Sequence, residues 1–532
     1  MTRKVKLSTA AEVAKSIRND SVILTTGFSL IGVAEEIYQK IEECFLSTGS
    51  PRDLTFVHSA GQSDTVRGME HLAHSPLLKR IIGSHWGMSP RLESLITKNE
   101  IEAFCLPMGQ IISMYKAAAS GKPGVLSKVG LSTFIDPRIE GGKMNRKSID
   151  SGAKVVHYIK IGEDDFLFYP SLKFDLYIGR GTSVDEAGNI TMEDECAKLE
   201  VMSAVQAVKA SGGRVIFQVK RVVKKNSLNP KDVVVPGIFV DEIVICENPY
   251  ENHRMTSSKY YDPVFSGELR EPQNRNHKVS ELQTKKLIGR RAIMELNEGD
   301  VVNLGVGIPG DSVGMIIEEE GMDNQITLSV ELGTIGGITV GGNDFGITKN
   351  AEAIIDKSQQ FDYYNGCGVD VTFMGAAEID LEGNVNVSKF GHRSPGCGGF
   401  IDITQSAKKL VFCSTFTSGG LDLDIVDGEI RIKREGKFNK FVNRVQQITF
   451  NGKLASKYKQ KVIFVTERAV FTLGEDGLAL TEIAPGIDLE KDILSKMDFV
   501  PIISNELKMM DASIYSRGRM QLSNFAKQKL ES

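Results

Sequence analysis

Glu331 carries the carboxylate whose sequence surroundings best suit covalent chemistry. It closes an apolar run made of Ile326, Leu328 and Val330, and a glycine-rich stretch from Gly333 to Gly337 follows it. A strand that ends in such flexible backbone is where an α/β protein exposes a reactive group. Glycines let a bulky ligand approach the main chain and leave backbone N–H groups free to meet developing negative charge. The pattern makes Glu331 a candidate nucleophile; an acidic residue that only ends a strand before a turn is the alternative interpretation.

Further glycine clusters follow apolar runs in the second half of the chain. They occupy residues 305–310, 333–337, 341–342, 396–399 and 419–420. In parallel α/β sheets, ligands bind outside the carboxyl ends of the strands, so these clusters favour an extended, thin ligand lying against backbone. A GxGxxG fingerprint with its downstream acid is not cleanly met at 305–310, which disfavours a dinucleotide fold. The sequence has no GxxxxGK[ST] motif, which excludes a P-loop nucleoside triphosphatase.

Internal similarity indicates how the chain is organised. The segment from Asp20 to Gly27 recurs as Asp300 to Gly307, each after a helical stretch, at a shift of 280 residues. Three further blocks recur at one shift of 195 residues: those at Asp175, Gly188 and Val215 reappear at Asp370, Gly383 and Leu410. The two shifts together predict two copies of one α/β unit, the first carrying about 85 extra residues between its matched segments.

The predicted fold class is α/β, with two tandem repeated domains built on mainly parallel sheets. Near-continuous apolar strands alternating with helical patterns favour such sheets. We expect an N-terminal domain over 1–250 that contains the insertion, a linker over 251–280, and a C-terminal domain over 281–532 that carries Glu331. The glycine-rich part of the insertion, residues 121–145, is predicted to form surface loops.

Composition excludes several classes of protein. The 532 residues are 41% hydrophobic and 25% charged with a net charge of −4, which offers no attraction to nucleic acid or an anionic membrane. The seven scattered cysteines form no CxxC pair, and the eight histidines form no HxxxH, so we expect neither disulfides nor a metal site. No apolar run approaches the roughly 18 residues of a membrane span. We therefore expect a cytoplasmic protein.

Longer ordered motifs carry a resemblance to a known family. They are Gly83-Ser-His-Trp-Gly-Met-Ser-Pro-Arg91, Gly121-Lys-Pro-Gly124, Thr133-Phe-Ile-Asp-Pro-Arg138, Asn303-Leu-Gly-Val-Gly-Ile-Pro309, Glu331-Leu-Gly333 and Gly398-Gly-Phe-Ile-Asp402. The chain resembles the family I CoA-transferases in the single-chain form where both subunit types are fused, and most closely the acetate/propionate CoA-transferases. The resemblance covers nearly the whole chain, from about residue 5 to about residue 515.

The resemblance implies ping-pong transfer of CoA between a short-chain acyl-CoA and a carboxylic acid such as acetate. Glu331 matches the family's catalytic glutamate, which forms a mixed anhydride and then a glutamyl-CoA thioester. Covalent catalysis of this kind divides a difficult exchange into easier steps. CoA and acyl-CoA are then substrates, and no tightly bound cofactor is expected. Relatives are generally oligomeric, so we expect a homo-oligomer, with a tetramer as the specific guess.

The resemblance also implies roles for six glycines. Backbone N–H groups near Gly109 and Gly419 would stabilise the tetrahedral oxyanions, and Gly305, Gly307, Gly398 and Gly399 would line the CoA. One position departs from the family pattern, because Met108 stands where many relatives have glutamine before the glycine. A side-chain amide donor is therefore absent, and only the backbone of Gly109 is left to donate.

Three other functions compete with CoA transfer. An acyl-CoA hydrolase would share the thioester chemistry and pass the acyl group to water. A sugar-phosphate isomerase on a related α/β unit would use Glu331 as a proton-transferring base. A non-catalytic CoA-binding protein would keep the glycines and lose the carboxylate, so the presence of Glu331 speaks against it.

Overall fold

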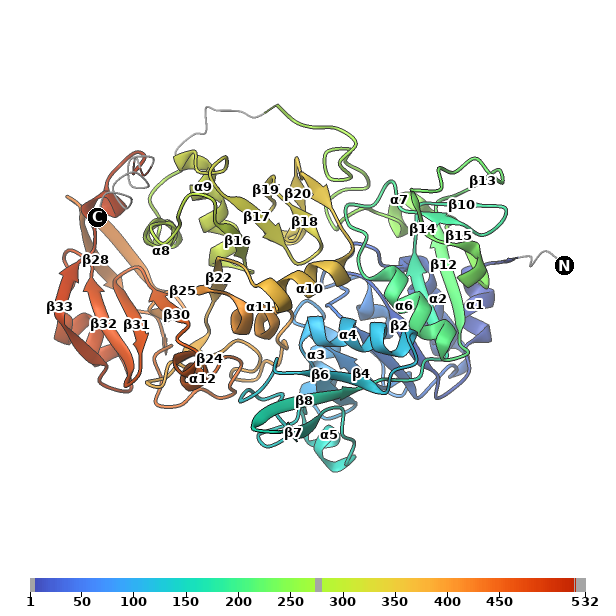
Figure 1. Cartoon of the computed structure of the whole chain (residues 1–532), viewed down its shortest axis with the longest axis horizontal. Coiled ribbons are helices and arrows are strands. Elements are labelled where there is room, and N and C mark those ends of the chain that lie inside the picture. The colour runs from blue at the N-terminus through green and yellow to red at the C-terminus, as the bar shows by residue number, and fades with distance from the viewer. Residues whose placement is uncertain (1–4, 273–279, 521, 523–532) are drawn as a thin grey trace.

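The computed structural model describes residues 5–272, 280–520 and 522. Residues 273–279 of the linker predicted over 251–280 lie outside the described residues, as do both ends of the chain. Two α/β regions follow one another along the chain, each built on a large sheet (Figure 1). The predicted α/β class with mainly parallel sheets is confirmed.

The first sheet has eight strands, and all neighbouring strands are parallel. Their spatial order is β1 (Lys6–Ser8), β15 (Glu242–Ile245), β12 (Arg214–Val219), β9 (Leu176–Arg180), β2 (Val22–Thr25), β3 (Leu54–His58), β4 (Leu78–Gly83) and β5 (Glu102–Cys105). Helices connect parallel strands and cover both faces of such a sheet, which explains the near-continuous apolar runs of its central strands.

The helices and small sheets of this first region complete its core. The helices are α1 (Ala10–Ser16), α2 (Glu35–Thr48), α3 (Pro90–Thr97), α4 (Met108–Ala119), α5 (Arg146–Asp150), α6 (Val201–Ala210) and α7 (Pro249–Asn252). One small sheet joins β6 (Gly124–Ser127), β8 (Asp164–Pro170) and β7 (His157–Ile161); another joins β13 (Arg221–Val223), β10 (Ser183–Asp185), β11 (Ile190–Thr191) and β14 (Val233–Val235).

The second large sheet has ten strands. Their order is β21 (Ala353–Ile354), β18 (Thr334–Ile335), β17 (Thr327–Val330), β16 (Val301–Leu304), β22 (Val371–Gly375), β25 (Lys409–Cys413), β30 (Lys461–Val465), β31 (Ala469–Gly474), β32 (Gly477–Ile483) and β33 (Ile502–Met509). The five strands from β17 to β30 are parallel, and antiparallel pairs lie toward both edges. The carboxyl ends of these five strands therefore meet at one edge.

Shorter elements surround this second sheet. The helices are α8 (Thr284–Ile293), α9 (Gly314–Glu320), α10 (Lys357–Cys367), α11 (Phe400–Ser406) and α12 (Gly452–Lys457). The two-stranded sheets are β19 (Ile338–Thr339) with β20 (Thr348–Lys349), β23 (Glu378–Ile379) with β24 (Val385–Asn386), β26 (Thr417–Ser418) with β29 (Phe438–Asn439), and β27 (Asp422–Val426) with β28 (Glu429–Arg434). Figure 1 shows α4, α10 and α11 lying together between the two large sheets.

The strands that the repeat matched occupy equivalent places in the two sheets. Arg214 pairs with Leu176 between β12 and β9, and Lys409 pairs with Val371 between β25 and β22, so the 195-residue shift preserves the register. The order β12-β9-β2-β3 in the first sheet corresponds to β25-β22-β16-β17 in the second. Glu331 follows β17, so the repeat places it at the carboxyl edge of the second sheet.

The segment 121–145 differs from the surface loops predicted for it. Phe134 and Ile135 are fully buried, and the Phe134 N–H donates to Ile448 O at 2.8 Å. Nearby, the Gly130 N–H donates to Gln405 Oε1 at 2.7 Å. Residues 121–123 and 137–139 are exposed, as the glycine content predicted. The buried residues between them, Phe134 and Ile135, instead pack the two regions together.

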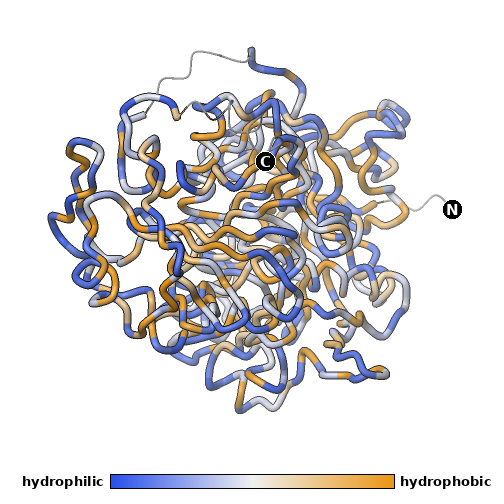
Figure 2. The backbone as a smooth tube through the Cα atoms, turned by 60° about the vertical axis from the view of Figure 1, so that its left-hand side comes forward, coloured by the Kyte–Doolittle hydropathy of each residue, from blue (hydrophilic) through white to orange (hydrophobic). Residues whose placement is uncertain are grey.

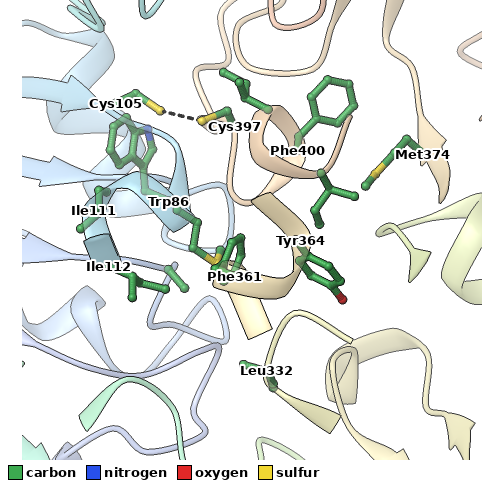
Figure 3. Packing of buried hydrophobic residues seen from close by; sticks show 14 of the residues in the cluster. Trp86, Cys105, Ile111, Ile112, Leu332, Phe361, Tyr364, Met374, Cys397 and Phe400 are labelled. Atoms are coloured by element: carbon green, nitrogen blue, oxygen red, sulfur yellow. Dashed lines mark hydrogen bonds between the residues drawn. The ribbon is translucent and has the colours of Figure 1, made fainter. Parts of the chain in front are cut away.

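Other contacts also join the two regions directly. The indole of Trp86, which follows β4, donates to Ser394 O, and Cys105 Sγ lies 3.6 Å from Cys397 Sγ. Figure 3 shows these two thiols pointing toward one another beside Trp86. In Figure 2, several hydrophobic stretches of the chain run side by side through the middle of the molecule. The two regions thus share one buried hydrophobic core. Cys397 belongs to this core, and Gly398 and Gly399 directly follow it in the chain.

His71, in the short helical turn Met69–Leu72, gives the first region a pH-dependent contact. Burial alone would lower its pKa, but hydrogen bonds and the charges of Glu35 and Glu42, at 2.8 and 2.5 Å, outweigh burial and raise the pKa to about 8. The pKa of His71 in the unfolded chain is about 6.5, so protonation of His71 stabilises the fold fully below about pH 6.5. This contribution is lost as the pH rises through about 8.

We therefore expect His71→Gln to lower the free energy of unfolding by about 1 kcal/mol near pH 6 and by little near pH 9, after allowance for solvent screening. Melting temperatures at the two pH values check this. His157→Gln, which removes an exposed imidazole, is the control. An equal loss for His71→Gln at both pH values would contradict the charge-based explanation.

Candidate active site

A tight turn presents Glu331 at the end of β17. The Gly333 N–H donates back to Val330 O at 2.9 Å, and β18 then returns antiparallel to β17. Gly333 has φ +96°, and a Cβ there would lie 2.3 Å from Ile355 O. Glycine is required at this turn both for its backbone conformation and for space. The sequence Glu-Leu-Gly therefore fixes where the carboxylate leaves the sheet.

The carboxyl group of Glu331 lies directly against Gly399, the residue before α11. A Cβ added at Gly399 would lie 2.9 Å from Glu331 Oε2 and 3.0 Å from Glu331 Cδ. Gly399 has φ −84°, so space, and not an unusual backbone conformation, demands glycine here. Among the described residues, no side chain or N–H donates a hydrogen bond to the Glu331 carboxylate within ordinary bonding distance.

The surroundings of Glu331 keep its carboxyl group close to half-ionised at neutral pH. Burial raises its pKa to about 7; the charge of Lys357 lowers the pKa, and the charge of Asp402 raises it. The side chain is half-buried, so a ligand can reach it although protein atoms surround it. A desolvated carboxylate without hydrogen-bond donors is a better nucleophile than one in water.

Asp402, one turn into α11, organises the opposite wall of the site. Burial raises the pKa of its carboxyl group to about 6, and hydrogen bonds oppose that shift. Those bonds come from Gln110 Nε2 at 3.0 Å, the Gly109 N–H at 2.9 Å and Asn365 Nδ2 at 3.4 Å. Gln110 and Gly109 belong to α4 of the first region, so Asp402 joins the two regions beside Glu331.

Lys357 is the buried cation of the site. Its Nζ donates to Ser59 Oγ at 3.0 Å and lies 3.4 Å from Glu200 Oε2, with no exposed side-chain surface on either charged partner. Ser59 donates to the other oxygen of Glu200. Lys357 begins α10 in the second region, whereas Ser59 and Glu200 belong to the first. The charge that acts on Glu331 is therefore held in place by the other half of the chain.

Of the glycines predicted to line CoA, three lie beside open space or beside Glu331. Gly307 has φ +87° and nothing within 4 Å of a Cβ position, and it lies at the end of β16 next to β17. Gly399 borders Glu331 as described, whereas a Cβ on Gly398 would meet only Met108 Cε, at 3.9 Å. Gly305 is different, because a Cβ there would lie 2.7 Å from Met374 Sδ, which explains the glycine by packing. Their contacts with CoA stay predictions.

The two predicted oxyanion donors differ in their placement. Gly109 lies next to Asp402, and its N–H already donates to Asp402 Oδ2 at 2.9 Å. Gly419 is exposed, and its neighbours are Phe438 and Lys437. It directly follows β26, in the segment after β25. The structure thus places Gly109 beside Asp402 with its N–H engaged, and Glu331 is not among the described neighbours of Gly419. Both oxyanion roles stay predictions.

Asp402 and Lys357 are the site residues that sequence reasoning did not single out. Asp402 closes the motif Gly398-Gly-Phe-Ile-Asp402, and its position three residues after Gly399 predicts one helical turn of separation. Lys357 has no comparable signal, because its partners Ser59 and Glu200 are distant in the sequence.

The residues that the structure describes contain no group of three or more His, Cys, Asp or Glu side chains placed to hold a metal ion. Within the same residues, no helix has the length and apolar character needed to cross a membrane.

Comparison with known proteins places this geometry in a family. A family model described as coenzyme A transferase matches residues 6–245. Over 96% of this chain and 97% of the relative, the sequence is 42% identical to caffeate CoA-transferase of Acetobacterium woodii. Over 96% of this chain and 95% of the relative, it is 39% identical to acetate CoA-transferase YdiF of Escherichia coli K12.

A solved structure matches the fold across both regions. The acyl-CoA transferase YdiF of Escherichia coli O157:H7, crystallised as a thioester complex with CoA, aligns with a TM-score of 0.89 at 38% identity and covers 97% of each chain. Its crystal structure without ligand aligns with a TM-score of 0.90. The likeness therefore extends over both α/β regions and the segments between them.

The contact between Gly399 and Glu331 makes a specific prediction. Gly399→Ala places a methyl group 2.9 Å from Glu331 Oε2, so the carboxylate must move by about half an ångström to regain ordinary contact. Because a misplacement of about 1 Å can cost about 100-fold in rate, we expect this smaller shift to slow turnover about 10-fold. The measurement is kcat, together with the melting temperature to verify folding.

Gly366→Ala is the matched control, because Gly366 lies in α10 and a Cβ there meets nothing within 4 Å. We expect that variant to keep its activity and stability. Full activity of Gly399→Ala would contradict the close fit inferred at Glu331.

Proposed function

The chain belongs to the coenzyme A transferase family, in the single-chain form that carries both halves, and from this premise we propose that it transfers CoA between a short-chain acyl-CoA and a carboxylic acid such as acetate. The observation that supports this most directly is the Glu331 carboxylate, which lies unpaired at the carboxyl edge of the second sheet against Gly399.

The proposed reaction proceeds in covalent steps that conserve the thioester's energy. A Glu331 oxygen attacks the acyl carbonyl, the C–S bond breaks, and CoA leaves as a thiolate from an acyl-glutamyl anhydride. The thiolate then attacks Cδ of Glu331, which breaks the C–O bond, releases the first carboxylate and forms a glutamyl-CoA thioester. A second carboxylate reverses both steps and leaves as acyl-CoA. Each step exchanges one nucleophile for another, so no ATP is consumed.

The charges around Glu331 suit this sequence. Glu331 must be ionised to attack, and the anhydride and thioester that follow carry no charge there. Lys357 favours the ionised form before attack, while burial and Asp402 favour loss of that charge. These opposing effects leave the ionised and the protonated forms of Glu331 close in free energy near pH 7. We assign Lys357 as a positioning residue that acts through the charge state of Glu331.

Backbone donors are needed for the tetrahedral oxyanions, and removing one typically costs about 10²- to 10³-fold in rate. The Gly399 N–H is favoured here, because the residue adjoins the Glu331 carboxyl group and its N–H has no acceptor among the described residues. We keep the Gly109 N–H as a second donor. In that role its hydrogen bond to Asp402 Oδ2 must break, so that the N–H can donate to the oxyanion instead. No contact with Glu331 among the described residues supports Gly419 as an oxyanion donor.

The acid substrate has two candidate classes. We propose a short aliphatic acid, as for the acetate CoA-transferase relative. An aromatic acid is the second candidate, because a relative at 42% identity is a caffeate CoA-transferase. The rings of Phe28 and Phe345 lie 6.3 Å apart, and Phe28 lies 5.9 Å from Lys357 Nζ, where they would stack on an aromatic acid. Rates with acetate and caffeate as acceptors decide between them.

Two other reactions use the same site differently. A hydrolase would release free acid and CoA in the absence of an acceptor acid, whereas a transferase would stop at the glutamyl thioester. A sugar-phosphate isomerase would leave Glu331 unmodified throughout. Assembly into a homo-oligomer stays a prediction, which light scattering of the purified protein tests.

Glu331→Gln is expected to abolish CoA transfer, a loss of at least about 10⁴-fold, because an amide cannot form the anhydride. In the native enzyme, acetyl-CoA followed by hydroxylamine or borohydride should modify the peptide that contains Glu331, as mass spectrometry would show. Glu475→Gln, which changes an exposed carboxylate, is the control. An unmodified peptide in an active enzyme would exclude the covalent route.

Lys357→Met is expected to move the acid limb of kcat/KM to higher pH. In the native enzyme the limb should lie near pH 7, because only the ionised form of Glu331 attacks. Removing the positive charge raises the pKa of Glu331, so activity appears only at higher pH. The measurement is kcat/KM as a function of pH.

Glu200 is left buried and unpaired in Lys357→Met, which threatens folding. The double variant Lys357→Met/Glu200→Gln removes the pair together, and Lys408→Met removes an exposed lysine as a control. An unchanged acid limb in a folded double variant would remove Lys357 from the proposed mechanism.

A further inference from the structure

Lys440 places an ammonium group at the carboxyl edge of the second sheet. Its Nζ donates to Ala376 O at 3.2 Å and to Ser414 Oγ at 2.8 Å. Ala376 directly follows β22, and Ser414 directly follows β25. The side chain is half-buried, so it spans the ends of two neighbouring strands and still reaches solvent.

This ammonium lacks the anionic partner that the more deeply buried lysines have. Lys220, Lys286 and Lys357 lie 3.1, 2.6 and 3.4 Å from a carboxylate. Within the described part of the chain, no carboxylate lies within 4.0 Å of Lys440 Nζ, and only two of its three N–H donors have acceptors. A half-buried charge without a counter-ion is costly unless a ligand supplies one.

The pKa of Lys440 shows that burial disfavours its charged form. Burial lowers its pKa to about 8, and the charge of Glu467 opposes this only partly. The carboxylate of Glu467 is itself engaged, because it accepts from the Phe416 N–H at 2.9 Å and from Arg468 Nε at 2.7 Å. An anion bound at Lys440 would raise this pKa again and would accept from the third N–H of the ammonium group.

Lys440 lies one strand away from the position where an open parallel sheet binds its ligands. From β16 the chain continues to β17 on one side, whereas β22 and β25 lie on the other, so the strand order reverses between β16 and β22. Ligands bind at such a switch point, outside the carboxyl ends of the strands. Here the loop Gly305–Gly307 meets the end of β22: Val306 is 68% exposed, and a Cβ on Gly375 would lie 3.6 Å from Val306 O.

Strand spacing separates Lys440 from the reacting carboxylate. Glu331 follows β17, and Lys440 contacts the ends of β22 and β25, which lie two and three places away. At the usual strand spacing this is about 10–14 Å. A group that reacts with Glu331 must come within about 3–3.5 Å of it, so Lys440 contacts a part of the substrate remote from the thioester.

We propose that Lys440 binds a phosphate group of the CoA moiety, with the pantetheine arm crossing the loop Gly305–Gly307 between Lys440 and Glu331. This inference rests on the proposed function, because it takes acyl-CoA as the substrate. The arm is extended and thin, which suits the open space at Gly307. An ammonium is a point-charge donor of the kind that binds phosphate in many nucleotide sites.

The test compares two thioesters in Lys440→Gln and in the native enzyme. Acetyl-CoA carries the phosphates, and acetyl-pantetheine carries the same thioester and arm without them. We expect KM for acetyl-CoA to rise about 10- to 100-fold, the usual effect of losing one charge-assisted hydrogen bond. KM for acetyl-pantetheine and for the acceptor acid should stay unchanged. Lys440→Arg should recover part of the affinity for acetyl-CoA.

Lys437→Gln is the matched control, because Lys437 is an exposed lysine on the same segment. Calorimetric binding of CoA to each variant measures the contact without turnover, so it separates this inference from the proposed reaction. Equal losses for both thioesters, or unchanged CoA binding in folded Lys440→Gln, would overturn the assignment to a phosphate. An enzyme that binds CoA through Lys440 but transfers none would instead overturn the proposed function.

Discussion

The structure depends on keeping one carboxylate out of water without giving it a hydrogen-bond partner. Glu331 lies against Gly399, where any side chain would displace it, and burial raises its pKa to about 7. Taking a charge into a protein interior costs free energy unless opposite charge is near. The charge of Lys357 offsets part of that cost without contacting the carboxylate, which leaves its oxygens free for the attack proposed above. A direct ion pair would stabilise Glu331 more and would block the proposed chemistry.

Both halves of the chain are needed for this balance. Lys357 and Asp402 belong to the second region, but Ser59 and Glu200 hold Lys357, and Gly109 and Gln110 hold Asp402, all from the first. The repeated α/β unit therefore does not form two separate sites. The second copy presents Glu331, the proposed nucleophile, and the first copy fixes the charges around it. The buried segment at Phe134 and the contact between Cys105 and Cys397 hold the two copies in register.

The sequence predicted well what depends on local pattern. Strands β2, β16, β22 and β25 lie at the repeated segments that begin at Asp20, Asp300, Asp370 and Leu410, because strands buried on both faces are continuously apolar. The shift of 195 residues even preserved the pairing register. Gly333 and Gly399 were recognisable as special, although only the structure shows that one is required by its backbone and the other by the Glu331 carboxylate.

What the sequence could not predict depends on contacts between distant residues. Lys357 resembles any lysine at a helix start until Glu200 is placed beside it. The Gly109 N–H was expected to be free, and Asp402, nearly three hundred residues away, engages it. The glycine content of 121–145 indicated surface loops, whereas Phe134 anchors that segment in the core. Propensity and spacing say nothing about such partners, because tertiary packing decides them.

The arrangement along the carboxyl edge of the second sheet separates the proposed binding of the CoA phosphate from the proposed reaction. Glu331 follows β17, the open loop Gly305–Gly307 follows β16, and Lys440 spans the ends of β22 and β25. Contacts made far from the reacting carbon can orient the thioester without stabilising its ground state at the carboxylate. A cation placed directly on Glu331 would favour the free enzyme over the anhydride. One placed two or three strands away can hold the substrate through every covalent step, because that part of the ligand does not change as the acyl group is exchanged.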